Sequence, residues 1–311
     1  MVVRETGEFA EDVYMLGSLF MPIYLVDGEN PVIFDAGIDI LGSLYVSEIK
    51  KKLGNRHPAY CMLTHSHFDH CGSVSYLKKH FPSMKIVSSD KIGRVLQQPR
   101  AVDLIKQLNR VMDPMMLVTK DYPVPDRFEP FEIDLPVKEG DTINLSSDLS
   151  VIAIETPGHT RDCISYYIPE KKMLFSSEAF GIGELDFYIQ AEFLVDYDMY
   201  YNSMKKMSRF ETEVLCIGHH NVFIGDDAVR YMNESIYHCE KFYELVKKCL
   251  EEENGDIEEV KIRIKAIEYD NNEKPKQPEL AYMLNLEARV KAVKRHVKEN
   301  IDGRDRCSSK I

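Results

Sequence analysis

The stretch "LTHSHFDHCGS" contains four side chains that commonly bind metal ions, and they fall within a span of six residues: His65, His67, Asp69 and His70. Neutral imidazoles are ligands for zinc, iron and manganese, and carboxylates suit the harder of these ions. In an extended segment His65 and His67 point to the same side, because side chains alternate along a strand. Asp69 and His70 reach a second position where the chain turns toward a helix. This one loop can therefore supply ligands to two adjacent ions.

Three further candidate ligands stand at the ends of other apolar runs: His159 in "TPGHT", Glu178 in "SSEAFG" and His219 in "CIGHH". Side chains that gather at strand ends over a rigid sheet form a preorganised site. Each candidate also has an ordinary interpretation. Pro-Gly-His-Thr can be a simple turn, and Glu178 can be an ordinary acid. His220 is a weaker candidate than His219.

The segments around these residues predict strands alternating with helices. Two apolar runs at 23–26 and 32–34 flank the turn residues "DGENP", which indicates a hairpin. The run "AYCML" predicts a short buried strand that ends at the histidine cluster, and "SVSYLKKHF" has helical spacing. Further strands are predicted at "MKIVSS", "LSVIAIE" and "VLCI". This alternation predicts α/β layering.

Near residue 226 the alternation of predicted strands and helices gives way to helical spacing of apolar residues. From Met232 to Leu250, apolar residues recur at steps of four and three, which is typical of one face of a helix. A second apolar stripe follows in the last predicted helix. We therefore expect an α/β domain over residues 1–225 and a helical C-terminal extension over residues 226–311.

The composition argues against several classes of partner. The formal net charge is −12, whereas nucleic acids and anionic membrane surfaces are bound by clustered Lys and Arg. No apolar run approaches the length that crosses a bilayer, and the first residues lack the apolar core of a signal peptide. The seven cysteines are scattered without CxxC pairs. We therefore expect reduced thiols and a cytoplasmic protein that binds neither nucleic acid nor membrane.

The motifs "THSHFDHCG", "TPGHT" and "GHH", with an acid at a strand end before the last one, resemble the metallo-β-lactamase-fold hydrolases over about residues 15–225. The resemblance implies an αββα metallo-β-lactamase sandwich with two metal ions at the edge of the sheets. It also implies one set of three ligands for each ion. These sets are His65, His67 and His159 for the first ion, and Asp69, His70 and His219 for the second.

Position 178 departs from the family pattern. The family usually has a bridging aspartate there, whereas this chain has Glu178. The additional methylene moves the carboxylate outward, while metal–oxygen distances tolerate errors of only ~0.2 Å. Either the backbone retreats, or Glu178 binds one ion only, or the second site is weak. The resemblance also implies that Asp35 orients a ligand. Thr64 and Thr160 are candidates for similar supporting roles, although as strand or turn residues they need none.

We expect a metal-dependent hydrolase with two divalent transition-metal ions of zinc, iron or manganese. Such ions lower the pKa of a bound water. The hydroxide attacks a thioester or ester of a small acyl substrate, with Asp69 as the catalytic residue that orients the nucleophile or relays a proton. The C-terminal helices would cover the metal-binding face, or bury their apolar stripes in a homodimer.

Three alternatives stay open. A phosphodiesterase would use the same dinuclear site on a different substrate. A di-iron oxidoreductase is disfavoured, because flavodiiron proteins usually have a glutamate where His67 stands and we expect no room for a flavin domain. A regulatory protein would keep the metal site as a structural element and use the helical extension as its docking surface.

Overall fold

The computed structural model describes residues 1–114, 120–186, 188–271, 277 and 279–308, with side chains described up to residue 299. The chain forms two compact units. The first comprises Met1–Thr156, Asp162–Glu178 and Phe210–Arg230, and the second comprises Pro157–Arg161, Ala179–Arg209 and Tyr231–Ile311. The division into residues 1–225 and 226–311 stays a prediction, and two segments that precede residue 225 group with the C-terminal helices.

The described residues of the first unit contain two seven-stranded sheets. The first sheet is antiparallel from β2 to β5 and parallel from β5 to β8. Its strands in spatial order are β2 (Gly7–Ala10), β3 (Val13–Ser18), β4 (Met21–Val26), β5 (Val32–Phe34), β6 (Tyr60–Met62), β7 (Lys85–Ser88) and β8 (Leu135–Pro136). The expected hairpin is confirmed as the antiparallel pair β4 and β5.

The second sheet is antiparallel except for one parallel pair, β12 with β15. Its strands in spatial order are β1 (Val2–Val3), β16 (Val222–Ile224), β15 (Val214–Ile217), β12 (Met173–Ser177), β11 (Ile164–Ile168), β10 (Ser150–Glu155) and β9 (Thr142–Asn144). A short 3-10 turn, η3 (Pro169–Lys171), connects β11 to β12.

Alternation along the strands divides the core between two faces of the first sheet. On β4, Ile23 and Leu25 belong to one hydrophobic cluster, whereas Tyr24 belongs to the cluster between the two sheets. Phe34 of β5 stacks on Phe175 of β12 with ring centroids 3.7 Å apart. The two sheets therefore form a packed sandwich that fixes the ends of their strands.

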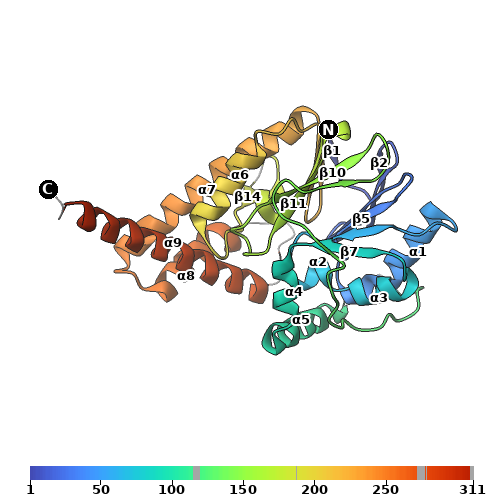
Figure 1. Cartoon of the computed structure of the whole chain (residues 1–311). Coiled ribbons are helices and arrows are strands. Elements are labelled where there is room, and N and C mark those ends of the chain that lie inside the picture. Colours follow the sequence, from blue (N-terminus) through green and yellow to red (C-terminus); the bar gives the residue numbers. More distant parts are fainter. Residues whose placement is uncertain (115–119, 187, 272–276, 278, 309–311) are drawn as a thin grey trace. The chain divides into compact units, whose positions relative to one another are not determined.

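Helices cover the outer face of the first sheet (Figure 1), and their apolar residues complete the hydrophobic cluster on that side. They are η1 (Asp39–Leu41), α1 (Gly42–Leu53), α2 (Phe68–Cys71), α3 (Val74–His80), α4 (Asp90–Leu96) and α5 (Pro99–Val111). Helix α1 ends at Gly54, whose φ of 62° suits glycine at a helix terminus. These elements agree with the helical spacing of the sequence.

The second unit is mainly helical. Its elements are the hairpin β13 (Ile182–Glu184) and β14 (Tyr188–Gln190), followed by α6 (Tyr197–Met207), α7 (Asp226–Glu252), α8 (Ile257–Lys265), the π-helical turn η5 (Ala266–Asp270) and α9 (Glu279–Ser308). Helix α7 begins in the first unit, and η4 (Glu178–Phe180) joins the two. The apolar stripe expected between Met232 and Leu250 lies buried except at the half-buried Ile236, so the helical C-terminal part is confirmed.

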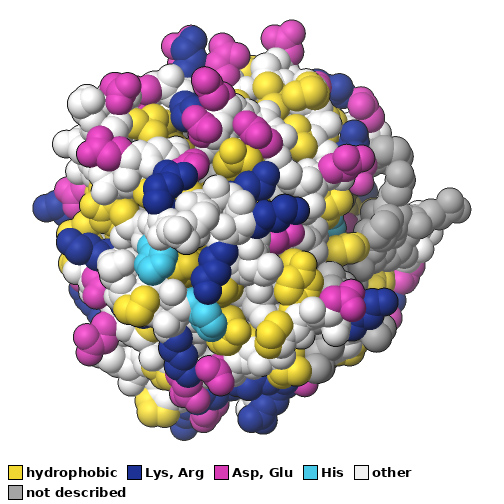
Figure 2. Space-filling model, turned by 90° about the vertical axis from the view of Figure 1, so that its right-hand side faces the viewer, with side chains coloured by type: hydrophobic (Ala, Val, Ile, Leu, Met, Phe, Trp, Pro, Cys, Tyr) yellow, Lys and Arg dark blue, Asp and Glu magenta, His cyan; other side chains and the backbone are white. Residues whose placement is uncertain are grey.

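On the face shown in Figure 2, acidic and basic side chains are interspersed, and neither kind gathers into an extended field among the described residues. The cysteines of the described part, namely Cys61, Cys71, Cys163, Cys216, Cys239 and Cys249, are buried and form no disulfide. Of the described helices, none combines the length and apolarity that a membrane span needs.

Candidate metal centre

The histidine cluster follows the carboxyl end of a parallel strand. Leu63, which follows β6, donates its N–H to Val87 at 2.9 Å, and Asp35, which follows β5, donates its N–H to Met62 at 2.9 Å. Helix α2 then begins, with His67 at its N-cap and the N–H of His70 donating to the His67 carbonyl at 3.0 Å. Because carboxyl ends of parallel strands meet at one sheet edge, this loop lies beside the acid of β5.

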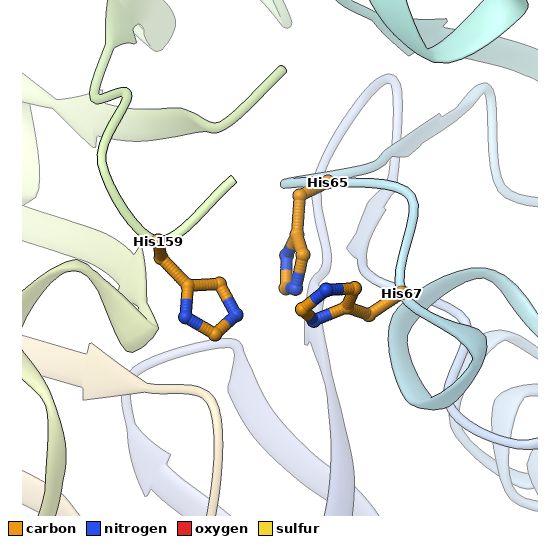
Figure 3. A group of neighbouring side chains, drawn as sticks. All are labelled: His65, His67 and His159. Carbon is orange, nitrogen blue, oxygen red and sulfur yellow. The ribbon is translucent and has the colours of Figure 1, made fainter. Parts of the chain in front are cut away.

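The expected ligands form three overlapping groups, and within each group the candidate ligand atoms lie within 4.8 Å of one another. One group is His65, His67 and His159, whose rings point toward one another in Figure 3. Another is Asp69, His70 and His219, and the third is His65, His70 and Glu178. Within the first unit the structure thus brings together Asp69, His70 and His219, the set that the resemblance implies for one ion, while the binding of ions stays a prediction.

Glu178 lies between the histidines of the first unit. Its Oε1 is 2.8 Å from Nε2 of His70 and 2.9 Å from Nε2 of His219, and its Oε2 is 3.6 Å from Nε2 of His65. Two ligand atoms that each lie ~2.1 Å from one ion are about 3.0–3.4 Å apart in octahedral or tetrahedral geometry. The three distances fall outside this range by only about 0.2 Å on either side, so the spacing, together with the mixed imidazole and carboxylate set, fits zinc, iron or manganese.

The longer acid is accommodated by an irregularity in the backbone. The pairing of β12 with β15 shifts between Phe175 and Ser177, and Ser177 has φ of 49°. A bulge of this kind re-aims the side chain that follows it. The Ser177 hydroxyl donates to Oε2 of Glu178 at 2.5 Å. Gly218 leaves the other side open, since a Cβ there would lie 2.3 Å from Oε1 of Glu178.

Asp35 orients one of the candidate ligands, as the resemblance implies. Its Oδ2 lies 2.7 Å from Nδ1 of His70, and its Oδ1 accepts hydrogen bonds from the backbone N–H and the hydroxyl of Thr64 at 2.8 and 2.9 Å. Asp35 has φ of 60°, a region that Asp and Asn tolerate better than most residues. A partner at Nδ1 leaves Nε2 of His70 to bind an ion.

Other ligand candidates are oriented by backbone carbonyls. Nδ1 of His159 is 2.7 Å from the Glu192 carbonyl oxygen, and Nδ1 of His219 is 2.6 Å from that of Phe20. Nδ1 of His65 lies 3.0 Å from the Thr64 hydroxyl. A hydrogen bond at one ring nitrogen fixes which nitrogen is available to a metal. Each of these rings therefore offers Nε2.

The charged groups of the site strongly shift one another's pKa values. Burial by itself raises the pKa of the Glu178 carboxyl, but the charges of His70 and His65 and hydrogen bonds from His219 and His70 hold that pKa well below its usual range. Burial lowers the pKa of His70, but the nearby carboxylates of Glu178, Asp35 and Asp69 raise it well above its usual value. A cation can therefore replace protons that the site holds between its imidazoles and carboxylates.

Several positions differ from or add to the sequence-based set. His220 belongs to none of the ligand groups of the described residues; its N–H donates to the Leu19 carbonyl, and its ring lies against Phe20. Thr160 is buried, and its carbonyl accepts the N–H of Gly158 at 3.0 Å. Asp162 was not expected, yet its Oδ2 accepts the N–H of Ser66 at 3.0 Å and ties the histidine loop to β11. No local pattern marks such a partner.

Residues 20–219 match the Metallo-beta-lactamase superfamily. The chain belongs to this superfamily, whose match covers almost two thirds of its length and includes all seven candidate ligands. The superfamily includes hydrolases, and the His, Asp and Glu groups described above are where its members' divalent metal ions would be held in this chain.

Curated relatives match parts of the chain. A hydroxyacylglutathione hydrolase of Rhodopseudomonas palustris (strain BisB5) is 28% identical over 123 residues, which are 39% of this chain and 34% of that protein. The uncharacterized protein YobT of Bacillus subtilis (strain 168) is 29% identical over 161 residues, 51% of this chain and 61% of that protein. The chain thus spans from about a third to about three fifths of the length of these relatives.

Solved structures share the fold. An archaeal metallo-beta-lactamase superfamily protein from Sulfolobus tokodaii superposes with a TM-score of 0.59 at 15% identity, covering 92% of this chain and 99% of that one. The flavodiiron protein of Giardia intestinalis gives a TM-score of 0.53 at 17% identity, covering 76% of this chain and 59% of that one. The expected metallo-β-lactamase fold class is confirmed by these likenesses, which concern the fold alone.

Proposed function

We propose that this protein is a metal-dependent hydrolase in which a metal-activated water attacks a thioester or ester of a small acyl substrate. The observation that carries the proposal is the convergence of His65, His70, Glu178, His219 and Asp69 at one place in the first unit. These residues come from three separate strand ends, and packing alone gives no reason to bury so many ionisable groups together.

In this proposal the candidate ligands and Asp35 have distinct roles. When bound, two divalent ions supply a hydroxide near neutral pH and neutralise the negative charge of the tetrahedral centre. Glu178 and the imidazoles would hold these ions, and Asp35, bonded to Nδ1 of His70, leaves Nε2 of that ring to bind one of them. The Asp69 side chain is 16% exposed, against 3% for Glu178. Asp69 therefore can meet an incoming substrate and take the proton of the nucleophile at its carboxylate.

Two likenesses support an acyl thioester as the substrate class. The relatives named hydroxyacylglutathione hydrolase act, by that name, on an acyl group carried by the thiol of glutathione. The stretch "THSHFDHCG", the insert "LIKQLNRVM" and the helical C-terminal part also resemble the quinolone-signal response thioesterase PqsE. A phosphodiester is the competing substrate, because the same two ions would bind its oxygens equally well.

The test combines metal analysis with a substrate panel. Elemental analysis of the full chain is expected to find close to two transition-metal ions, or one if Glu178 serves a single ion. The panel contains an acyl thioester, a carboxylic ester and bis-p-nitrophenyl phosphate. Hydrolysis of the first two supports the proposal, and turnover of the phosphodiester alone would replace it with a phosphodiesterase. Bound metal without any hydrolysis would favour the regulatory role.

Replacing Asp69 with Ala tests the assignment of the catalytic residue. Hydrolysis is expected to disappear while the circular dichroism spectrum is unchanged. The matched control is Asp126→Ala, because Asp126 is an exposed acid whose ion pair with Lys79 lies at the surface. Wild-type turnover in the Asp69 variant would contradict the assignment.

A further inference from the structure

The second unit contains a buried ion pair that the proposed reaction does not use. Nη1 and Nη2 of Arg289 in α9 donate to the two carboxylate oxygens of Glu268 in η5 at 2.9 and 2.8 Å. The side chains are 0% and 3% exposed. The hydroxyls of Tyr188 and Tyr282 donate to the same carboxylate at 2.5 and 2.7 Å. Glu268 is thus held by donors from both β14 and α9.

This pair does more than add stability. Apolar residues of similar size often stabilise a protein interior as well as a buried ion pair does. A guanidinium, unlike an apolar group, can also fix a backbone carbonyl, and Nη1 of Arg289 donates to the Ala191 carbonyl at 3.3 Å. The Phe242 ring lies against the guanidinium, with its centroid 4.4 Å from Cζ. Tyr188 begins β14 and Ala191 follows it, so this network holds the short strand at both ends.

The next residue along the chain orients a candidate metal ligand. The carbonyl of Glu192 lies 2.7 Å from Nδ1 of His159, and the N–H of Glu192 donates to the Tyr200 hydroxyl at 3.3 Å. The loop of His159 is also pressed against this region: Gly158 has φ of 135°, and a Cβ there would lie 2.3 Å from the backbone nitrogen of Tyr200. The N–H of Val195 donates to the Gly158 carbonyl at 3.0 Å.

We propose that Arg289 is a positioning residue for His159. Arg289, anchored on Glu268, fixes the Ala191 carbonyl. Through the backbone it thereby holds the next carbonyl, that of Glu192, which sets the ring orientation of His159. The proposal rests on the proposed function, because it concerns a ligand of the candidate metal centre. It gives the C-terminal helices a definite task, which is to keep one imidazole aligned for an ion.

The first test compares two buried cations of the same unit. Arg289→Met removes the donors to Glu268 and to the Ala191 carbonyl while keeping an unbranched side chain. Lys261→Met is the matched control, because Lys261 is also buried but pairs with Glu258 and Glu287 instead. Competition with a chromophoric chelator is expected to show metal affinity about 3–10-fold weaker in the Arg289 variant, less than the about 10–100-fold typical of a direct partner of a ligand. Equal losses in both variants would overturn the proposal.

A double-mutant cycle separates positioning from general loosening. In a His159→Ala background, Arg289→Met is expected to cause no further loss of metal affinity, since the ligand it positions is gone. A loss of the same size in both backgrounds would overturn the proposal. If Arg289→Met fails to fold, the same cycle is run with Tyr188→Phe combined with Tyr282→Phe, which removes two donors to Glu268 with little change in volume.

Failure of this proposal is distinguishable from failure of the proposed function. A wild-type protein that binds no transition metal overturns both. A wild-type protein that binds its ions, together with an Arg289→Met variant of unchanged affinity, overturns only the positioning role. The cobalt-substituted protein gives an independent signal, because loss of one imidazole donor changes the visible absorption of bound Co²⁺ in the Arg289 variant but not in the Lys261 control.

Discussion

Gly218→Ala is expected to displace a candidate metal ligand while leaving the fold intact. A Cβ at position 218 would lie 2.3 Å from Oε1 and 2.8 Å from Cδ of Glu178, and 3.2 Å from Cε1 of His70. Its φ lies outside the left-handed region, so the backbone tolerates alanine and the effect is one of space. Glu178 must therefore move, and the Ser177 hydroxyl bonded to Oε2 limits where it can go.

The size of the effect follows from these distances. Restoring an ordinary contact of 3.4 Å requires the carboxylate and the new methyl group to separate by about 1.1 Å. Metal–ligand distances tolerate only ~0.2 Å, so Glu178 is expected to lose its bond to at least one ion. Losing a direct ligand should weaken binding at least as much as losing its hydrogen-bond partner, which means about tenfold or more. Crowding itself should lower the free energy of unfolding by about 1–3 kcal/mol.

Two measurements separate these effects. Chelator competition gives the metal affinity, and urea unfolding in the presence of a chelator gives the stability of the metal-free protein. Gly42→Ala is the matched control, because a Cβ there would also be crowded, at 2.9 Å from Cδ1 of Tyr76, but its three nearest atoms belong to Tyr76 and Ser73 and not to a candidate ligand. The control should change stability without changing metal affinity.

A second variant restores the space. Combining Gly218→Ala with Glu178→Asp shortens the acid by one methylene and withdraws its carboxylate from the new methyl group. Part of the lost affinity should return. If Gly218→Ala binds metal with wild-type affinity, Glu178 does not hold an ion in the position that the structure gives it, and the reasoning fails.

Three further predictions concern the same chain. Asp35→Asn keeps a residue suited to positive φ but removes the carboxylate from Nδ1 of His70, and metal affinity measured by chelator competition should fall about 10–100-fold; an unchanged affinity would contradict the role of Asp35. In the metal-free protein the raised pKa of His70 gives stability that is lost as pH rises through that pKa, and the lowered pKa of Glu178 gives stability that is lost as pH falls through it. Because an ion must displace the proton of His70, metal affinity should rise as pH rises through the raised pKa of that imidazole, and a flat profile would argue against this competition. Leu280 and Leu284 are exposed one helical turn apart on α9, so if the C-terminal helices form a homodimer, replacing both with Glu should shift the mass from light scattering to that of one chain; an unchanged dimer would place the interface elsewhere.

The sequence by itself determined the kinds of ligand and the elements that carry them. The loop at 65–70 needs no tertiary information, because four metal-binding side chains in six residues define their own chemistry. The apolar runs of β4 and β5 and the helical stripe of α7 were also predictable, since these strands are buried on both faces and the helix along one. Local periodicity carries this information directly.

Tertiary structure alone decided how the side chains are aimed. The Phe20 carbonyl that orients His219 lies 199 residues away in the sequence, and a backbone carbonyl leaves no trace in residue type. The same holds for the Glu192 carbonyl beside His159. The bulge before Glu178 also depends on the pairing of two distant strands. Residue types are local properties, whereas orientation depends on contacts that form only when remote segments pack together.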